Sequence, residues 1–95
     1  MSVAFEWDAT KELLNIQKHG VSFIEAVETF SDPKGIKLID ETHTRTEPRF
    51  YWVGKSLEGG VLTTRFTMRA DIVRIIGSAH WRKFSKLYDE TAKTR

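Results

Sequence analysis

Residues 61–76, VLTTRFTMRADIVRII, have the pattern of two β-strands joined by a tight turn. Thr, Phe and Met recur at strand spacing from Val61 to Arg69, and β-branched residues dominate from Ile72 to Ile76. Only Ala70-Asp71 separates the two runs, and a connection this short joins antiparallel strands. The stretch therefore predicts two neighbouring antiparallel strands near the end of the chain.

The pattern continues toward the N-terminus. Residues 36–39 alternate, residues 49–53 are aromatic and β-branched, and Glu58-Gly59-Gly60 forms a turn, so we expect an antiparallel meander of about four strands. Residues 3–7 predict a first strand, and residues 9–18, 22–31 and 81–93 predict helices. The predicted order is β-α-α-β-β-β-β-α, an α+β fold with the helices packed on one face of a twisted sheet.

The boundaries of the first two helices have recognisable signals. Asp8 is placed to cap the first helix, and Lys18-His19-Gly20 is a typical helix end. Leu13, Leu14 and Gln17 recur at helical spacing, which predicts the buried face of that helix. Ser22 and Glu25 have the spacing of a capping box at the start of the second helix.

The composition bounds the class of protein. A chain of 95 residues with 40% apolar and 29% charged residues predicts a single globular domain, residues 1–95. Cysteine is absent, so disulfides and thiolate zinc sites are excluded. No apolar run approaches about 20 residues and no basic-then-apolar leader begins the chain, so we expect no membrane contact and a cytoplasmic location.

Positive charge is concentrated in the last third of the chain. Residues 1–64 hold seven Lys or Arg against ten Asp or Glu, whereas residues 65–95 hold eight against three. Such a local field suits a polyanion such as RNA or DNA. A solvated basic helix, or a surface for an acidic protein, explains the same charge.

Metal-independent RNA hydrolysis needs a base, cations near the phosphate and an acid for the leaving oxygen. Arg74 is the first candidate, because a guanidinium within an apolar strand needs an anion; a buried salt bridge to Glu47 or Asp71 is the alternative. Glu47 and Arg49 share a strand face if the strand extends so far. Arg65 and Arg69 also share a face and predict a phosphate clamp, unless they are simply solvated.

Two histidines and the start of the last helix complete the candidates. His19 is explained by its helix end and is also a candidate for catalysis, and His80 is expected near Arg74 across the strand end. The histidines lack metal-ligand spacing, so no metal or cofactor is expected. Arg82 and Lys83, beside Trp81, combine charge and aromatic surface as RNA-binding proteins do, although packing explains the aromatic residues as well.

Several short motifs occur in the order found in one family. They are FEWD (5–8), KHGVSF (18–23) with Lys11 and Asn15 before it, Glu25-Ala26, Phe30, Glu47 with Arg49, Gly54 and IVRII (72–76). The chain thereby resembles the BrnT-type ribonuclease toxins of type II toxin–antitoxin systems. Residues 77–81 and Ser85 depart from the arginine-rich segment and glutamate of that family.

The resemblance implies a RelE-like fold, an RNA substrate and a BrnA-type antitoxin through which alone the complex contacts DNA. It also implies roles for His19, for Glu47 as base and for Arg49 as its orienter. We therefore expect a metal-independent endoribonuclease centred on Arg74, Glu47 and Arg49. A non-catalytic nucleic-acid- or protein-binding module, or an inactive toxin fold, is the alternative. Exposed apolar surface, for which residues 50–52 are candidates, would mark the antitoxin site.

Overall fold

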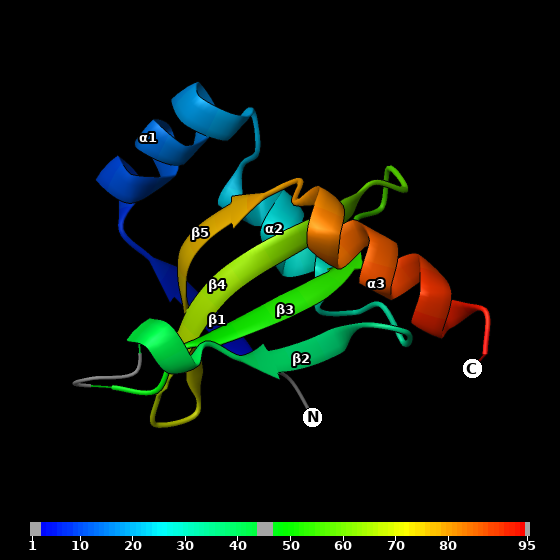
Figure 1. Cartoon of the computed structure of the whole chain (residues 1–95). Coiled ribbons are helices and arrows are strands. Elements are labelled where there is room, and N and C mark those ends of the chain that lie inside the picture. Colours follow the sequence, from blue (N-terminus) through cyan, green and yellow to red (C-terminus); the bar gives the residue numbers. More distant parts are fainter. Residues whose placement is uncertain (1–2, 44–46, 95) are drawn as a thin grey trace.

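The computed structural model describes residues 3–43 and 47–94. Figure 1 shows a curved sheet with helices around it. Among the described residues, no helix is both long and apolar enough to cross a membrane. The elements, in chain order, are β1 (Ala4–Trp7), α1 (Ala9–His19), α2 (Phe23–Thr29), β2 (Ile36–Ile39), a 3₁₀ turn (Glu41–His43), β3 (Phe50–Lys55), β4 (Val61–Arg69), β5 (Ile72–Ala79) and α3 (Arg82–Ala92).

The five strands form one sheet in the order β1-β5-β4-β3-β2. Strands β2 to β5 are consecutive antiparallel neighbours, which confirms the predicted meander and element order. β1 adds to the outer edge of β5 in a parallel pairing. The register between β4 and β5 shifts at Arg65/Phe66, because Arg65 pairs with Gly77 and Phe66 pairs with Ile75. Ile76 is the additional residue, so the alternation of faces is interrupted on β5 and continues on β4.

α2 covers one face of the sheet and builds the core. Phe23 and Ala26 of this helix are fully buried against Phe66, Val73 and Ile75. Aromatic rings from β1, β3 and the end of α2 surround this centre. Burying such rings removes much apolar surface from water, so this face supplies most of the hydrophobic stabilisation.

α3 packs on the opposite face, so the prediction that all helices share one face was wrong. Tyr51 and Trp52 are adjacent in β3 and point to opposite faces. The Tyr51 ring lies 5.3 Å from Phe84 of α3, whereas the Trp52 ring stacks at 5.2 Å on Phe30, beside α2. Figure 1 shows α2 behind the sheet and α3 in front of it.

α1 is held to β5 by a polar residue. Leu13 and Leu14 are 62% and 58% exposed, so the predicted apolar inner face was wrong. The buried residue is Asn15, whose Nδ2 donates to the carbonyls of Val21 and Ser78, while its Oδ1 accepts from Ser78 N–H. Those three hydrogen bonds fix α1 above the C-terminal end of β5.

The predicted helix boundaries agree with the structure. Asp8 accepts from the N–H groups of Thr10 and Lys11, which lowers the pKa of its carboxyl group. Gly20 ends α1 with φ +69°, a conformation that glycine adopts without strain. Ser22 and Glu25 form the complete capping box.

Candidate functional site

A cleft opens between the C-terminal half of α1 and strands β4 and β5. It consists of two adjoining hollows of about 310 and 290 Å³. We call it the cationic cleft and define it by Lys11, Asn15, Lys18, His19, Arg65 and Trp81. Of these, Lys11, Asn15, Lys18 and His19 belong to the sequence motifs quoted above. The cleft therefore brings residues of α1 together with residues that lie 46 or more positions later in the chain.

Local geometry explains how these side chains meet. The Asn15 hydrogen bonds hold α1 over the end of β5, and His19 is the last residue of that helix. Arg65 of β4 pairs with Gly77 of β5. A methyl group on Gly77 would lie 3.7 Å from Arg65 Nη2 and 3.6 Å from Asn15 Oδ1, so the guanidinium and the amide both lie over this glycine.

The charge of the cationic cleft has one sign. Its walls carry Lys11, Lys18, Arg65 and His19, and no carboxylate occurs among the described residues that line it. The other lining residues are the Asn15 amide, several small, hydroxyl-bearing or aliphatic side chains, and Trp81, which is 47% exposed. Cations without a lining counter-charge attract an anion.

Tyr51 lies between Arg65 of this cleft and the α3 helix. It is the register partner of Arg65 across β3 and β4, and its hydroxyl group hydrogen-bonds the Asp40 carboxylate. Burial raises the pKa of the Tyr51 phenol, and the Asp40 charge raises it further. Tyr51 is therefore a neutral hydrogen-bond donor near neutral pH.

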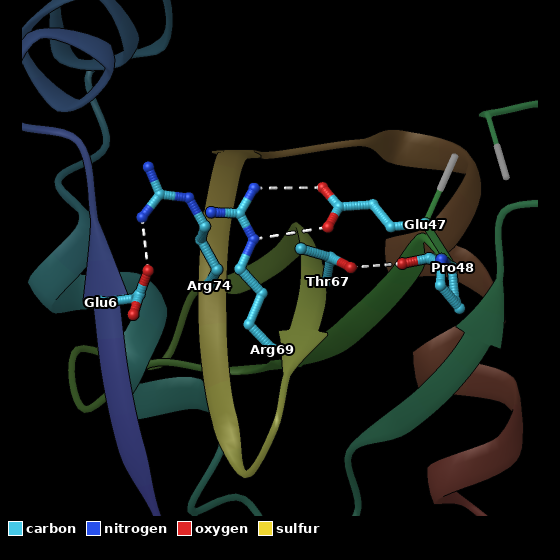
Figure 2. A network of polar contacts seen from close by, with 6 residues as sticks. All are labelled: Glu6, Glu47, Pro48, Thr67, Arg69 and Arg74. Atoms are coloured by element: carbon cyan, nitrogen blue, oxygen red, sulfur yellow. Dashed lines mark hydrogen bonds and ion pairs between the residues drawn. The ribbon is translucent and has the colours of Figure 1, made fainter. Parts of the chain in front are cut away.

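A second group of charges lies farther along the same face, and we call it the charged cluster: Glu6, Glu47, Arg69 and Arg74. Figure 2 shows Arg74 reaching Glu6 on β1, and Arg69 holding Glu47 through both carboxylate oxygens at 3.3 and 3.4 Å. The predicted salt bridge of Arg74 to Glu47 or Asp71 was wrong. Glu6 is instead the parallel register partner of Arg74.

Glu47 is ionised in this setting. The hydrogen bond from Arg69 lowers the pKa of its carboxyl group, and the charges of Arg69, Arg49 and Arg74 add to the effect. The expected association of Glu47 with Arg49 is thus electrostatic, while the hydrogen-bonded partner is Arg69. The Thr67 hydroxyl donates to the Pro48 carbonyl, which fixes this loop beside β4 (Figure 2).

The cleft and the cluster occupy one face but separate positions. The side chains of Arg65 and Arg69 leave the same side of β4, with Thr67 between them. The two residues are about 13 Å apart along the strand. His80 is far from Arg74, contrary to expectation, because its Nδ1 lies 3.1 Å from the Val61 carbonyl at the other end of β4. Arg82 and Lys83 are exposed on the first turn of α3.

Sequence reasoning missed several of these residues. Glu6 alternates with Phe5 and Trp7, so it carried the same signal as Arg74, a charge within an apolar strand. Lys18 was interpreted as part of a helix end and of the KHGVSF motif, and no role in RNA binding was predicted for it. Among residues 3–43 and 47–94, no group of three or more His, Asp or Glu side chains could hold a metal ion.

Comparison with known proteins identifies the family. The family described as ribonuclease toxin, BrnT, of type II toxin–antitoxin system matches residues 7–84. A structural relative is the crystal structure of the Brucella abortus ribonuclease toxin BrnT, with a TM-score of 0.62 and 18% identity over 84% of this chain and 97% of that one. No curated protein sequence matches. The relation to RelE-like folds stays a prediction. The chain belongs to the BrnT family of type II toxin–antitoxin ribonuclease toxins.

Proposed function

We propose that this protein is a metal-independent endoribonuclease that cuts single-stranded RNA in the cationic cleft. The observation that carries the proposal is the meeting of His19 with Arg65 and two lysines in a cleft whose described lining has no carboxylate. A phosphodiester entering there meets cations that lack a lining counter-charge, and the imidazole of His19, whose ring nitrogens can accept or donate a proton.

The reaction uses the RNA's own 2′-hydroxyl group. His19 accepts the 2′-hydroxyl proton, the 2′-oxygen forms a bond to phosphorus, and the bond from phosphorus to the 5′-oxygen breaks. The products are a 2′,3′-cyclic phosphate and a 5′-hydroxyl group, which takes its proton from water in the open cleft. Arg65 and Lys18 stabilise the charge that develops on the phosphoryl oxygens.

The charged cluster is assigned to RNA binding rather than to cleavage. Arg74 and Arg69 already hold Glu6 and Glu47. A carboxylate whose pKa is lowered is a weak base near neutral pH, so Glu47 suits proton abstraction less than His19 does. Arg69 has a half-exposed side chain and can meet a backbone phosphate about 13 Å beyond Arg65. This assignment moves the reaction centre away from Arg74, Glu47 and Arg49, where the sequence alone suggested it.

The test is cleavage of an end-labelled single-stranded RNA by the purified protein in EDTA. His19→Gln and Arg65→Gln are expected to lower the rate about 100-fold or more while keeping the folded structure. Arg74→Gln is expected to weaken binding, whereas Glu47→Gln removes a negative charge beside Arg69 and is expected to strengthen it. Both variants are expected to leave the rate at saturating RNA nearly unchanged. Leu57→Ala is the control, since this side chain is 83% exposed in a turn outside both groups.

Each other outcome has a definite meaning. Rate loss confined to Arg74→Gln and Glu47→Gln would place the reaction at the charged cluster. Loss of cleavage in EDTA that returns with magnesium would contradict metal independence. RNA binding without any cleavage would favour the non-catalytic binding module.

We also propose a BrnA-type antitoxin as the partner, with DNA contacted only through the complex. Leu13, Leu14 and Ile16 on α1 are each more than 40% exposed, and Leu14 also lines the cleft. An antitoxin on this surface would bury the apolar side chains and block RNA entry together. The residues expected from the sequence, 50–52, instead pack on the protein's own rings. Leu13→Glu is expected to abolish co-purification with the antitoxin but not RNA cleavage.

A further inference from the structure

A groove lies on the far side of Trp81 from the cationic cleft. Its volume is about 490 Å³, and we call it the aromatic groove, defined by Ile39, Asp40, Tyr51, Trp81, Lys83 and Phe84. Trp81 lines both the groove and the cleft. Tyr51, on the groove's wall, is also the register partner of Arg65 in the cleft. The two hollows therefore adjoin each other, and both are lined by the Trp81 indole.

One wall of the groove is a platform of three rings. The Tyr51 and Trp81 centroids are 5.7 Å apart, and each lies 5.3 Å from the Phe84 centroid. Phe84 is half-buried, but Trp81 leaves 47% of its surface exposed. Trp81 stands at the N-cap of α3 without making a side-chain cap bond. Helix capping therefore does not explain why the indole lies at the surface.

The inner end of the groove is polar and ordered. Asp40 is only 4% exposed, and its Oδ1 accepts from Thr42 N at 3.2 Å and from Thr42 Oγ1 at 2.8 Å. The Tyr51 hydroxyl group bonds the same carboxylate. These bonds hold the Asp40 carboxylate in place. Lys83 lies at the opening, where it can meet a phosphate.

We propose that the aromatic groove is a nucleobase subsite for the nucleotide next to the phosphate held by Arg65. This proposal rests on the proposed ribonuclease function. The base stacks on the exposed indole of Trp81, which the Tyr51 and Phe84 rings support from the side. Exposed aromatic rings beside a cationic channel are how proteins bind single-stranded nucleic acid. The groove thus holds one base beside the scissile bond.

The test uses a short RNA whose 2′-positions are methylated, so that it binds but cannot be cut. Each nucleotide in turn is replaced by an abasic one, and affinity is measured by fluorescence anisotropy. One abasic position is expected to weaken binding to the natural protein by about tenfold or more. That same position is expected to have no effect in Trp81→Leu, and to regain its effect in Trp81→Phe. Leucine keeps apolar contact with Phe84 but cannot stack.

The failure of this subsite can be told apart from failure of the function. An enzyme that cleaves RNA, yet shows no abasic position whose effect depends on Trp81, would overturn the subsite alone. If Trp81→Leu keeps the abasic effect but loses antitoxin binding, the groove belongs to the antitoxin. Thermal unfolding of each variant, with Leu57→Ala alongside, excludes loss of fold as the cause.

Discussion

The two faces of the sheet are made by the same strands but serve different ends. On the α2 face, Phe23, Phe66 and Ile75 are at most 3% exposed and pack together in one hydrophobic cluster. On the α3 face, the helix covers only the part near Tyr51 and Phe84, and Arg65, Arg69 and Arg74 emerge beyond it. Strand alternation lets one face supply stability while the other carries charge.

Charge on the α3 face is itself divided into two regions. Arg69 and Arg74 are matched with carboxylates, whereas the described residues lining the cleft supply no carboxylate beside Arg65. Arg74 on β5 is paired with Glu6 on β1, and Arg69 on β4 is paired with Glu47 in the loop before β3. Arg65 and its neighbouring lysines are arranged for an incoming anion.

The largest expected effect is on the α2 face. Phe23→Ala removes a fully buried ring that packs edge-on against Trp7, and we expect the free energy of unfolding to fall by about 3 to 5 kcal/mol. Ile24→Ala changes the next residue, which is 62% exposed, and should cost far less. Urea unfolding of both variants measures the contrast. Equal losses would contradict the division between buried and open surface.

Asn15 is an exception to this division, because it lines the cationic cleft and also stabilises the fold. Asn15→Ala leaves two carbonyls and one N–H group without their partner, so we expect a loss of about 2 to 3 kcal/mol in the free energy of unfolding. Gln17→Ala, on the exposed side of the same helix, is the control. Hydrogen exchange at the Ser78 amide should quicken in the Asn15 variant only; unchanged protection would mean that α1 is held by other contacts.

Asp32 ties the far end of α3 to the rest of the chain. Although burial acts to raise the pKa of its carboxyl group, bonds from the Tyr88 hydroxyl and from the Lys55 and Lys34 N–H groups outweigh that effect and lower it. A lowered pKa gives stability that is present above about pH 4, the range of an unfolded aspartate, and is lost as pH falls through the folded value.

Asp32→Asn is therefore expected to cost about 1 to 2 kcal/mol in the free energy of unfolding near pH 7. The difference from the natural protein should shrink on acidification below about pH 4. Unfolding midpoints measured from pH 7 to pH 3 give the comparison. A difference that stays constant over this range would exclude a contribution from the charge of Asp32.

The smallest effect on stability is expected in the charged cluster. Arg69→Gln breaks an exposed ion pair, so the unfolding midpoint should not change measurably. RNA affinity should fall, and the slope of log affinity against log salt should decrease by about 0.7 for one lost phosphate contact. A lower unfolding midpoint with an unchanged salt slope would make the pair structural.

Local patterns in the sequence predicted much of this molecule. Asp8, Gly20 and the Ser22–Glu25 box mark helix ends through bonds within a few residues, so their neighbours alone specify them. Period-two alternation specified β4 in full, from Val61 to Arg69. The ordered motifs also indicated the family, and they contain four of the residues that define the cationic cleft.

Only the tertiary structure decided which partners those residues have. Glu6 and Arg74 are 68 positions apart and meet because β1 joins β5 in parallel, a pairing that no local pattern specifies. Asn15, and not Leu13 or Leu14, is the inward residue of α1. The backbone of Ser78 on β5 forms two hydrogen bonds with its side chain, and the Val21 carbonyl accepts a third. The sequence determined the elements and their ends, because these depend on adjacent residues. The packing of distant elements determined the cleft, because its cations come from a helix and a strand that only the folded sheet brings together.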